Sequence, residues 1–163
     1  PLEEITKLQG REYRAEIIQE FGLCITPSKA LVFNEAQKEN WNINDLRVLG
    51  ISVTGEFGPY DVFKSRLLFP IWDQRGRIVG FGGRKLRNAK KELAKYINSR
   101  ESLVYKKEEV LYGLWQNKRK IAEKDFAYLV EGYTDVISLK NFGVENAVAT
   151  CGTALTSKKA NQI

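Results

Sequence analysis

The sequence predicts an α+β protein in which a mixed region of helices and strands is followed by a short segment where strands and helices alternate. Residues 66–84, RLLFPIWDQRGRIVGFGGR, have the β-rich arms and the tight central turn of an antiparallel hairpin. Roughly the last 40 residues alternate apolar runs with helical patterns, which is typical of a parallel sheet with crossover helices. With 163 residues, 43% of them hydrophobic, the chain is long enough for one compact domain or two small ones.

The first elements are predicted from helical spacing and from glycine. Residues 2–21 carry apolar side chains at roughly helical spacing, interrupted at Gly10, and Gly22 follows them as a helix C-cap would. Residues 23–33, LCITPSKALVF, then indicate a short extended piece and a turn around Pro27.

A short helix and a small hairpin are predicted before residue 66. Asn44 is placed to cap a helix that ends at Gly50. Residues 51–63, ISVTGEFGPYDVF, are rich in β-branched and aromatic residues, and their glycines predict a hairpin with its turn near residues 55–59.

The larger hairpin is followed by an irregular stretch and then by alternating elements. Its second arm contains Gly80, Gly82 and Gly83, which predict a bulge or a close approach of another backbone or side chain. Residues 86–99, LRNAKKELAKYINS, are basic and predicted to be irregular. The remaining pattern predicts, in order, a helix over 113–125, a strand over 126–130, a helix over 134–142 ended by Gly143, a strand over 144–150 and a helix that begins at residue 156.

Composition argues against several classes of protein. The chain has no histidine and only two cysteines, Cys24 and Cys151, so neither a disulfide framework nor a zinc site is predicted. We expect a reducing, cytoplasmic setting and no membrane span, because no run of about 18 apolar residues and no signal peptide is present. The net charge of +6 suits an anionic partner without requiring one. Since the chain opens at Pro1 and lacks methionine, we expect it to be part of a longer protein.

Candidate site residues follow the two predicted parallel strands. Glu131 comes directly after residues 126–130, and Gly152 and Thr153 come after the next strand; ligands of such sheets bind at the carboxyl ends of the strands. Glu131 is then either a metal ligand or general base, or a loop acid favoured by the start of a helix. Magnesium usually takes one or two carboxylates plus phosphates, and Asp135 is either the second acid or a helix cap.

Basic and aromatic residues are interleaved through the middle of the chain. Together they suit a groove for single-stranded nucleic acid, in which cations neutralise phosphates and rings stack on bases. A solvated basic face over an aromatic core explains the same pattern. The residues are Arg66, Arg84, Lys95, Lys106 and Lys107, with Phe69, Phe81, Tyr96 and Tyr105. The segment FGGR lacks the spacing of a nucleotide-binding loop.

Five motifs, in one order, resemble the catalytic core of bacterial replicative primases of the DnaG type. They are RLLFPIWDQRGRIVGFGGRKL, KYINSRES, VLYGL, VEGYTDVISL and NAVATCGTALT, and the resemblance runs from about residue 9 to the end. It implies an amino-terminal subdomain of the primase core over residues 1–120 and the first βαβ(α) part of a TOPRIM domain over 121–163. It also implies DNA-templated synthesis of short RNA primers from ribonucleotides by a nucleotidyltransferase that uses Mg²⁺ or Mn²⁺.

The resemblance also implies roles for single residues. Glu131 matches the TOPRIM glutamate, which is expected to bind metal or to act as base for the attacking hydroxyl. Lys107 matches the lysine before LYGL, although a second lysine at 106 replaces part of the usual motif. Contacts to template DNA or nucleotide are expected from Arg66, Arg84, Lys95, Tyr96, Asn98, Lys107, Gly152 and Thr153.

The same resemblance sets the expected partners and what lies outside the chain. Partners are a single-stranded DNA template, ribonucleoside triphosphates and the RNA primer, in the cytoplasm near the nucleoid. The family's later acidic pair, its zinc domain and its carboxyl-terminal domain, which binds the replicative helicase, are not in this sequence, so we expect the chain alone to be inactive. Alternatives are a non-catalytic nucleic-acid-binding module or another TOPRIM protein, a topoisomerase or nuclease. The FGGR and KYINS segments favour the primase.

Overall fold

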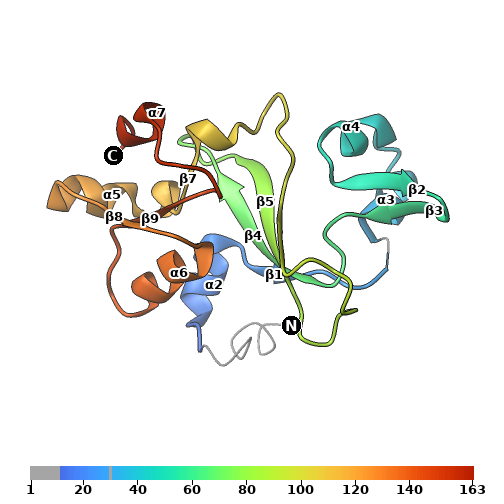
Figure 1. Cartoon of the computed structure of the whole chain (residues 1–163), viewed down its shortest axis with the longest axis horizontal. Helices are drawn as coiled ribbons and strands as arrows, with labels where there is room; N and C mark the ends of the chain where they lie inside the picture. Colours follow the sequence, from blue (N-terminus) through green and yellow to red (C-terminus); the bar gives the residue numbers. More distant parts are fainter. Residues whose placement is uncertain (1–11, 30) are drawn as a thin grey trace.

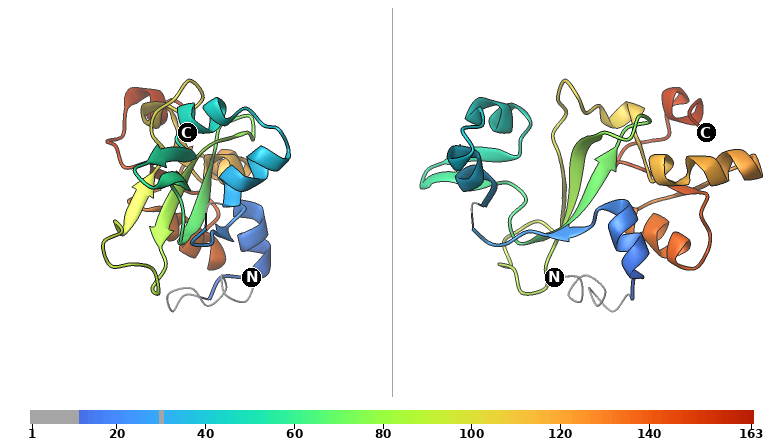
Figure 2. Two further views of the ribbon diagram at one scale, coloured as in Figure 1. Left: turned by 90° about the vertical axis from the view of Figure 1, so that its right-hand side faces the viewer. Right: turned by 180° about the vertical axis from the view of Figure 1, so that it is seen from behind.

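The fold consists of a central sheet with a smaller lobe on one side and an α/β layer on the other. The computed structural model describes residues 12–29 and 31–163. In this part of the chain, the four-stranded central sheet has the order β1-β4-β5-β6, the lobe contains the pair β2-β3, and the α/β layer contains the sheet β7-β9-β8. Figure 1 shows the lobe and the α/β layer at opposite ends of the long axis, and the view from behind in Figure 2 agrees.

The central sheet confirms the predicted hairpin. Its strands are β1 (Cys24–Ile25), β4 (Arg66–Trp72), β5 (Ile78–Lys85) and β6 (Tyr96–Asn98), all paired antiparallel. The ladder between β4 and β5 shifts register between Ile71 and Trp72, so the bulge lies near Gly80. Strand β6 falls within the stretch predicted to be irregular, and that prediction is wrong here. Its three residues become a strand because β5 offers them a free edge, which a local pattern does not reveal.

The helices before the large hairpin confirm one predicted boundary and correct another. Helix α2 (Ala15–Phe21) ends at Gly22, whose φ of 64° is the left-handed C-cap that the sequence predicts. Residues 2–11 of that predicted helix lie outside the described residues. Helix α4 (Ile43–Val48) is capped by the side chain of Asn42, which accepts from the Asn44 N–H, so the cap precedes the predicted one by two residues.

Helix α3 (Leu31–Lys38) was not predicted, because its cap comes from a distant residue. The buried carboxylate of Asp61 accepts from the Val32 N–H at 2.8 Å and from the Phe33 N–H at 3.2 Å. Asp61 ends the hairpin of β2 (Ser52–Gly55) and β3 (Gly58–Asp61), which confirms the predicted turn. The first turn of α3 is therefore stabilised from another element.

Removing this tertiary cap should destabilise the lobe. We expect Asp61→Ala to lower the free energy of unfolding by about 1 to 2 kcal/mol, since two backbone N–H groups lose their acceptor. Chemical denaturation of this variant against Glu56→Ala, an exposed acid in the turn of the same hairpin, measures the effect. Equal midpoints for the two variants would contradict the cap.

The α/β layer confirms the predicted alternation and adds one strand. Its elements are the 3-10 turn η2 (Lys107–Glu109), β7 (Leu111–Tyr112), α5 (Leu114–Lys124), β8 (Tyr128–Val130), α6 (Tyr133–Asn141), β9 (Ala147–Thr150) and α7 (Ser157–Ala160). Strands β8 and β9 are parallel, as predicted, whereas the two-residue β7 joins β9 antiparallel. Because β7 precedes residue 120, hydrogen bonds of this sheet cross the predicted domain boundary.

One hydrophobic core joins the α/β layer to the central sheet. The buried side chains of Phe21 in α2, Phe69 in β4 and Val136 in α6 belong to the same cluster. Buried Lys140 of α6 adds polar links, because its Nζ lies 2.6 Å from Glu20 and 3.0 Å from the Asn117 Oδ1. Close packing of this kind fixes how the carboxyl ends of β8 and β9 face the central sheet.

Candidate nucleic-acid and metal site

The carboxyl ends of the two parallel strands open into one hollow, which we call the Glu131 hollow. Glu131 follows β8, Thr150 is the last residue of β9, and both line a hollow of about 540 Å³. The opposite wall comes from the central sheet. The remaining lining residues are Phe69, Arg84, Lys95, Tyr96, Asn98, Gly132, Tyr133, Thr134, Asp135 and Gly152.

Two carboxylates lie on the α/β side of the Glu131 hollow. Glu131 is exposed, and Asp135 lies one helical turn later in α6. The Asp135 Oδ2 accepts from the Gly132 N–H at 3.1 Å, which confirms the predicted capping use of this acid. Among the described residues, no three acidic, cysteine or histidine side chains are grouped as metal ligands. Magnesium usually takes one or two protein carboxylates together with phosphates, so the carboxylate of Glu131 fits part of such a site.

Two cations and a ring face them from the central sheet. Arg84 of β5 is paired with Tyr96 of β6, and its guanidinium carbon lies 5.3 Å from the centre of the Tyr96 ring. The Nζ of Lys95 lies 5.7 Å from the same ring, which is about half exposed. Cations held beside an accessible aromatic face can bind a phosphate while the ring stacks on a base.

Arg66 is placed elsewhere, by the alternation of side chains in the sheet. In the ladder, Arg66 is paired with Lys85, whereas Arg84 is paired with Leu67 and Tyr96. Successive side chains point to opposite faces, so Arg66 lies on the face away from the Glu131 hollow. It is buried, its Nη1 donates to the Ala94 carbonyl at 2.9 Å, and burial lowers the pKa of its guanidinium.

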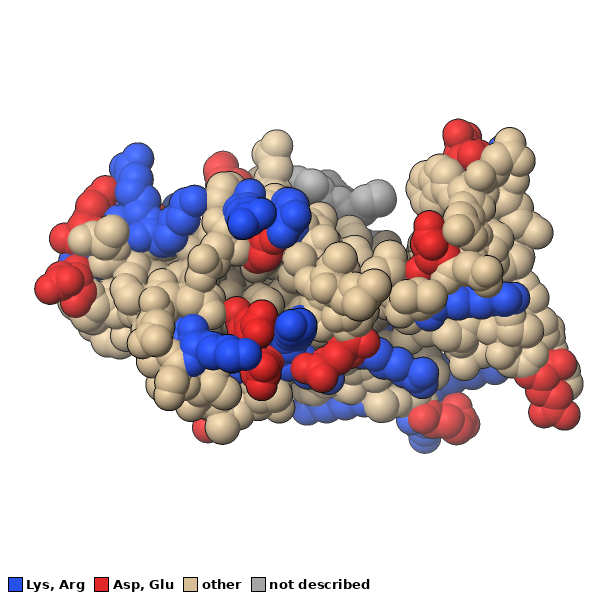
Figure 3. Space-filling view, turned by 90° about the horizontal axis from the view of Figure 1, so that it is seen from above, with Lys and Arg blue, Asp and Glu red and all other residues tan. Residues whose placement is uncertain are grey.

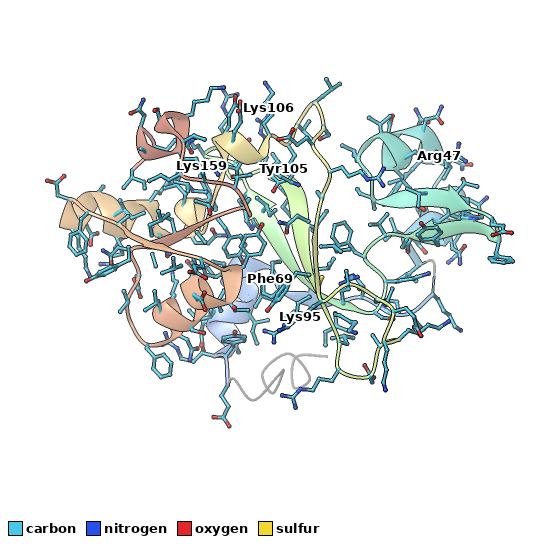
Figure 4. The ribbon with its side chains drawn as sticks, in the orientation of Figure 1. Arg47, Phe69, Lys95, Tyr105, Lys106 and Lys159 are labelled. Carbon is cyan, nitrogen blue, oxygen red and sulfur yellow. The ribbon has the colours of Figure 1, made fainter. Side chains whose placement is uncertain are left out.

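Lys107 and Thr153 are also outside the lining of the Glu131 hollow. Lys107 lies in η2, where its backbone N–H donates to Glu101 at 3.1 Å. Figure 4 shows its neighbour Lys106 at the upper edge of the molecule and Lys95 in the lower half. Thr153 accepts a hydrogen bond from the buried Lys159 in α7. The structure thus brings together Arg84, Lys95, Tyr96, Asn98, Glu131 and Gly152, and leaves Arg66, Lys107 and Thr153 apart from them.

Sequence reasoning gave no role to Tyr133, which lines the hollow two residues after Glu131. One signal was available, because the predicted close approach at Gly82 is met by Tyr133. A Cβ added to Gly82 would lie 2.2 Å from Tyr133 Cε2. Thr150 also lines the hollow and was recognisable only as the end of a strand.

A second hollow, of about 650 Å³, lies between η2, α7 and the turn of the large hairpin; we call it the Lys106 hollow. Its cations are mostly paired with acids: Arg77 lies 2.7 Å from Asp73, and Lys158 lies 2.9 Å from Glu109. Figure 3 shows basic and acidic side chains next to each other on this upper face of the molecule. Because the charges are compensated, the Lys106 hollow is less suited to phosphates than the Glu131 hollow.

Comparisons with known proteins identify the family to which the chain belongs. Residues 3–118 match the model of the DNA primase catalytic core, N-terminal domain, and residues 125–163 match the Toprim domain. The DNA primase of Aquifex aeolicus is 50% identical over 156 residues, which is 94% of this chain and 30% of that protein. The DNA primase of Mycobacterium tuberculosis is 40% identical over 148 residues, which is 90% of this chain and 23% of that protein.

Solved structures give the same result. One of them is the RNA polymerase domain of the M. tuberculosis primase DnaG, in a complex with a double-stranded DNA oligomer that has a 6-nucleotide overhang. It matches with a TM-score of 0.86 and 38% sequence identity, and the match covers 96% of this chain and 49% of that chain. Within the residues described, no helix is both long enough and apolar enough to cross a membrane. The chain belongs to the DnaG-type DNA primases, as a part of their catalytic core that ends within the Toprim domain.

Proposed function

We propose that this chain supplies part of the active site of a primase, a DNA-directed RNA polymerase that makes short RNA primers on single-stranded DNA. The observation that carries the proposal is the Glu131 hollow, where an exposed carboxylate at the end of β8 faces Arg84 and Lys95. The match of residues 3–118 favours a primase over a topoisomerase or nuclease, which would share only the Toprim part. Since the chain spans 23% to 30% of its relatives, the activity belongs to the longer protein.

Divalent metal binding is proposed for the acidic side of the hollow. Glu131 would hold Mg²⁺ or Mn²⁺ together with substrate phosphates and with acids from elsewhere in the protein. Bound metal would neutralise the charge that develops on the attacked α-phosphate. Alternatively, Glu131 would accept the proton of the attacking 3′-hydroxyl, a role that its exposure supports.

Template and nucleotide are proposed to bind on the basic side. Arg84 and Lys95 would contact phosphates, and the half-exposed ring of Tyr96 would stack on a base. Base pairing selects the nucleotide, so no side chain has to read a base edge. One similar structure is of a DnaG primase catalytic domain bound to single-stranded DNA, which supports this choice of partner.

Other expectations from the family are kept as proposals. Lys107 and Thr153 would contact nucleic acid that runs beyond the hollow, and Gly152 would let a substrate approach the backbone, because glycine has no Cβ. Arg66 would act by holding the segment before β6 rather than by touching DNA. On the same basis we propose that the two domains of the chain meet at residue 120. We also propose that the protein acts in the cytoplasm near the nucleoid and works with a replicative helicase.

A priming assay tests the function directly. The full-length protein that contains this chain should make short RNA on a single-stranded template from ribonucleotides when Mg²⁺ or Mn²⁺ is added, and a chelator should stop it. Absence of RNA together with relaxation or nicking of plasmid DNA would contradict the proposal in favour of another Toprim enzyme.

The basic side of the hollow can be tested by salt dependence. We expect Lys95→Ala to weaken binding of single-stranded DNA and to lower the slope of log K against log salt by about 0.7, the loss of one phosphate contact. Lys91→Ala, at an exposed lysine outside the hollow, is the matched control and should keep the slope. Identical slopes for both variants would show that Lys95 does not contact a phosphate of the bound DNA.

A further inference from the structure

Asn98 has both ends of its side-chain amide engaged by other parts of the protein. Its Oδ1 accepts from the Tyr133 hydroxyl at 3.2 Å, and its Nδ2 donates to the Cys151 carbonyl at 3.4 Å. A backbone carbonyl can only accept, so the amide nitrogen must face Cys151 and the amide oxygen must face Tyr133. The orientation of Asn98 is therefore set from within the protein.

Tyr133 is held just as firmly. Its ring stacks on Tyr112 of β7 with centres 4.3 Å apart, and it lies 5.9 Å from the ring of Phe69 in β4. Burial raises the pKa of its hydroxyl well above the ordinary value for tyrosine, so the group stays a protonated donor at working pH. Tyr133 thus donates its O–H to Asn98, and the side chains of Cys151 and Tyr105 lie beside the same hydroxyl.

Gly82 makes this approach possible. It is paired with Asn98 across the β5–β6 ladder, and a Cβ at this position would lie 2.2 Å from Tyr133 Cε2 and 3.2 Å from the Asn98 Oδ1. Only glycine lets the Tyr133 ring lie against β5 here.

These contacts connect the three segments that carry the proposed chemistry. Tyr133 starts α6 two residues after Glu131, Asn98 ends the strand that begins with Tyr96, and Cys151 precedes Gly152. We propose that Asn98 and Tyr133 are positioning residues that hold Glu131 and the 152 turn at a fixed distance from Lys95 and Tyr96, and that Asn98 does not act as a contact for template or nucleotide. This inference rests on the proposed primase function.

Paired substitutions in the full-length protein separate positioning from ligand contact. Asn98→Ala and Tyr133→Phe should each lower kcat for priming by about tenfold, while KM for ribonucleotides and Kd for single-stranded DNA stay within about twofold. The kcat of the double variant should lie within about twofold of that of the slower single variant, because both changes break the hydrogen bond between Asn98 and Tyr133.

Two matched controls guard against general effects. Asn88→Ala changes an exposed asparagine and Tyr128→Phe a half-exposed tyrosine, both outside the Glu131 hollow, and both should prime like the unchanged protein. If Asn98→Ala raises KM or Kd while Tyr133→Phe primes normally, Asn98 touches a ligand and the proposal is overturned. Multiplying effects in the double variant would overturn it as well.

A second readout does not depend on priming. Hydrogen–deuterium exchange should become faster in residues 131–135 of both single variants and in residues 150–154 of Asn98→Ala, which also loses the bond to Cys151. Neither segment should change in the two controls. Faster exchange in a protein that makes no primers would refute the primase function and leave the link intact. Unchanged exchange in both segments would refute the link, whatever the protein catalyses.

Discussion

Replacing Glu131 by glutamine is expected to reduce primer synthesis by about a thousandfold or more, within the range for loss of a general base or metal ligand. Glutamine keeps the shape of the side chain and removes the charge that a divalent ion requires. Because Glu131 is exposed and lies on the acidic side of the hollow, affinity for template DNA should change by less than about twofold. Steady-state priming and DNA-binding titrations on the full-length protein provide the two measurements.

The control for this experiment is Glu56→Gln, which changes an exposed acid at the turn between β2 and β3 in the lobe. It should prime at the normal rate. Normal priming by the Glu131 variant would show that the carboxylate at the end of β8 takes no part in the chemistry.

Alanine at Gly82 is expected to damage both stability and activity. The added Cβ would collide with the ring of Tyr133, which is itself stacked on Tyr112 and has little room to move. Overpacking of this kind costs about 1 to 3 kcal/mol. We therefore expect a lower melting temperature together with slower priming, because the start of α6 must shift away from β5.

Gly80, two residues earlier in the same strand, offers a graded comparison. Its Cβ would lie 3.2 Å from Tyr105, a contact that small shifts can relieve. Gly80→Ala should therefore lose less stability than Gly82→Ala, as thermal unfolding of the two variants would measure. The reverse order would mean that Tyr133 does not pack against β5 as described.

Much of the secondary structure was predictable because its information is local. Gly22 ends α2, Gly143 follows the end of α6, and the DQRG turn closes the large hairpin. Each of these boundaries is determined by a few neighbouring residues. The parallel pairing of β8 and β9 followed from the alternation of strands and helices. These rules need no knowledge of the rest of the fold.

The missed elements depend on partners that are distant in sequence. Helix α3 begins where Asp61 accepts its N–H groups, and β6 and β7 are too short to show an alternating pattern of their own. Each forms because a cap or a free edge is already in place. No window of local sequence contains that information.

The candidate site was predictable in part for the same reasons. Glu131 and Gly152 follow parallel strands, so their meeting at one edge was expected, and Arg84, Tyr96 and Asn98 join them through the register of β5 with β6. Arg66 is the instructive exception. The two-residue alternation of a strand separates it from Arg84 once the register is known, and the sequence alone does not give the register.

The central claim is that metal and phosphates meet at Glu131 in the hollow. Anomalous scattering from Mn²⁺, in crystals of the full-length protein with a ribonucleoside triphosphate and a single-stranded template, locates the ion most directly. The account predicts a peak in contact with the Glu131 carboxylate, with phosphates against Arg84 and Lys95. A peak with its phosphates in the Lys106 hollow, and Glu131 without metal, would contradict it.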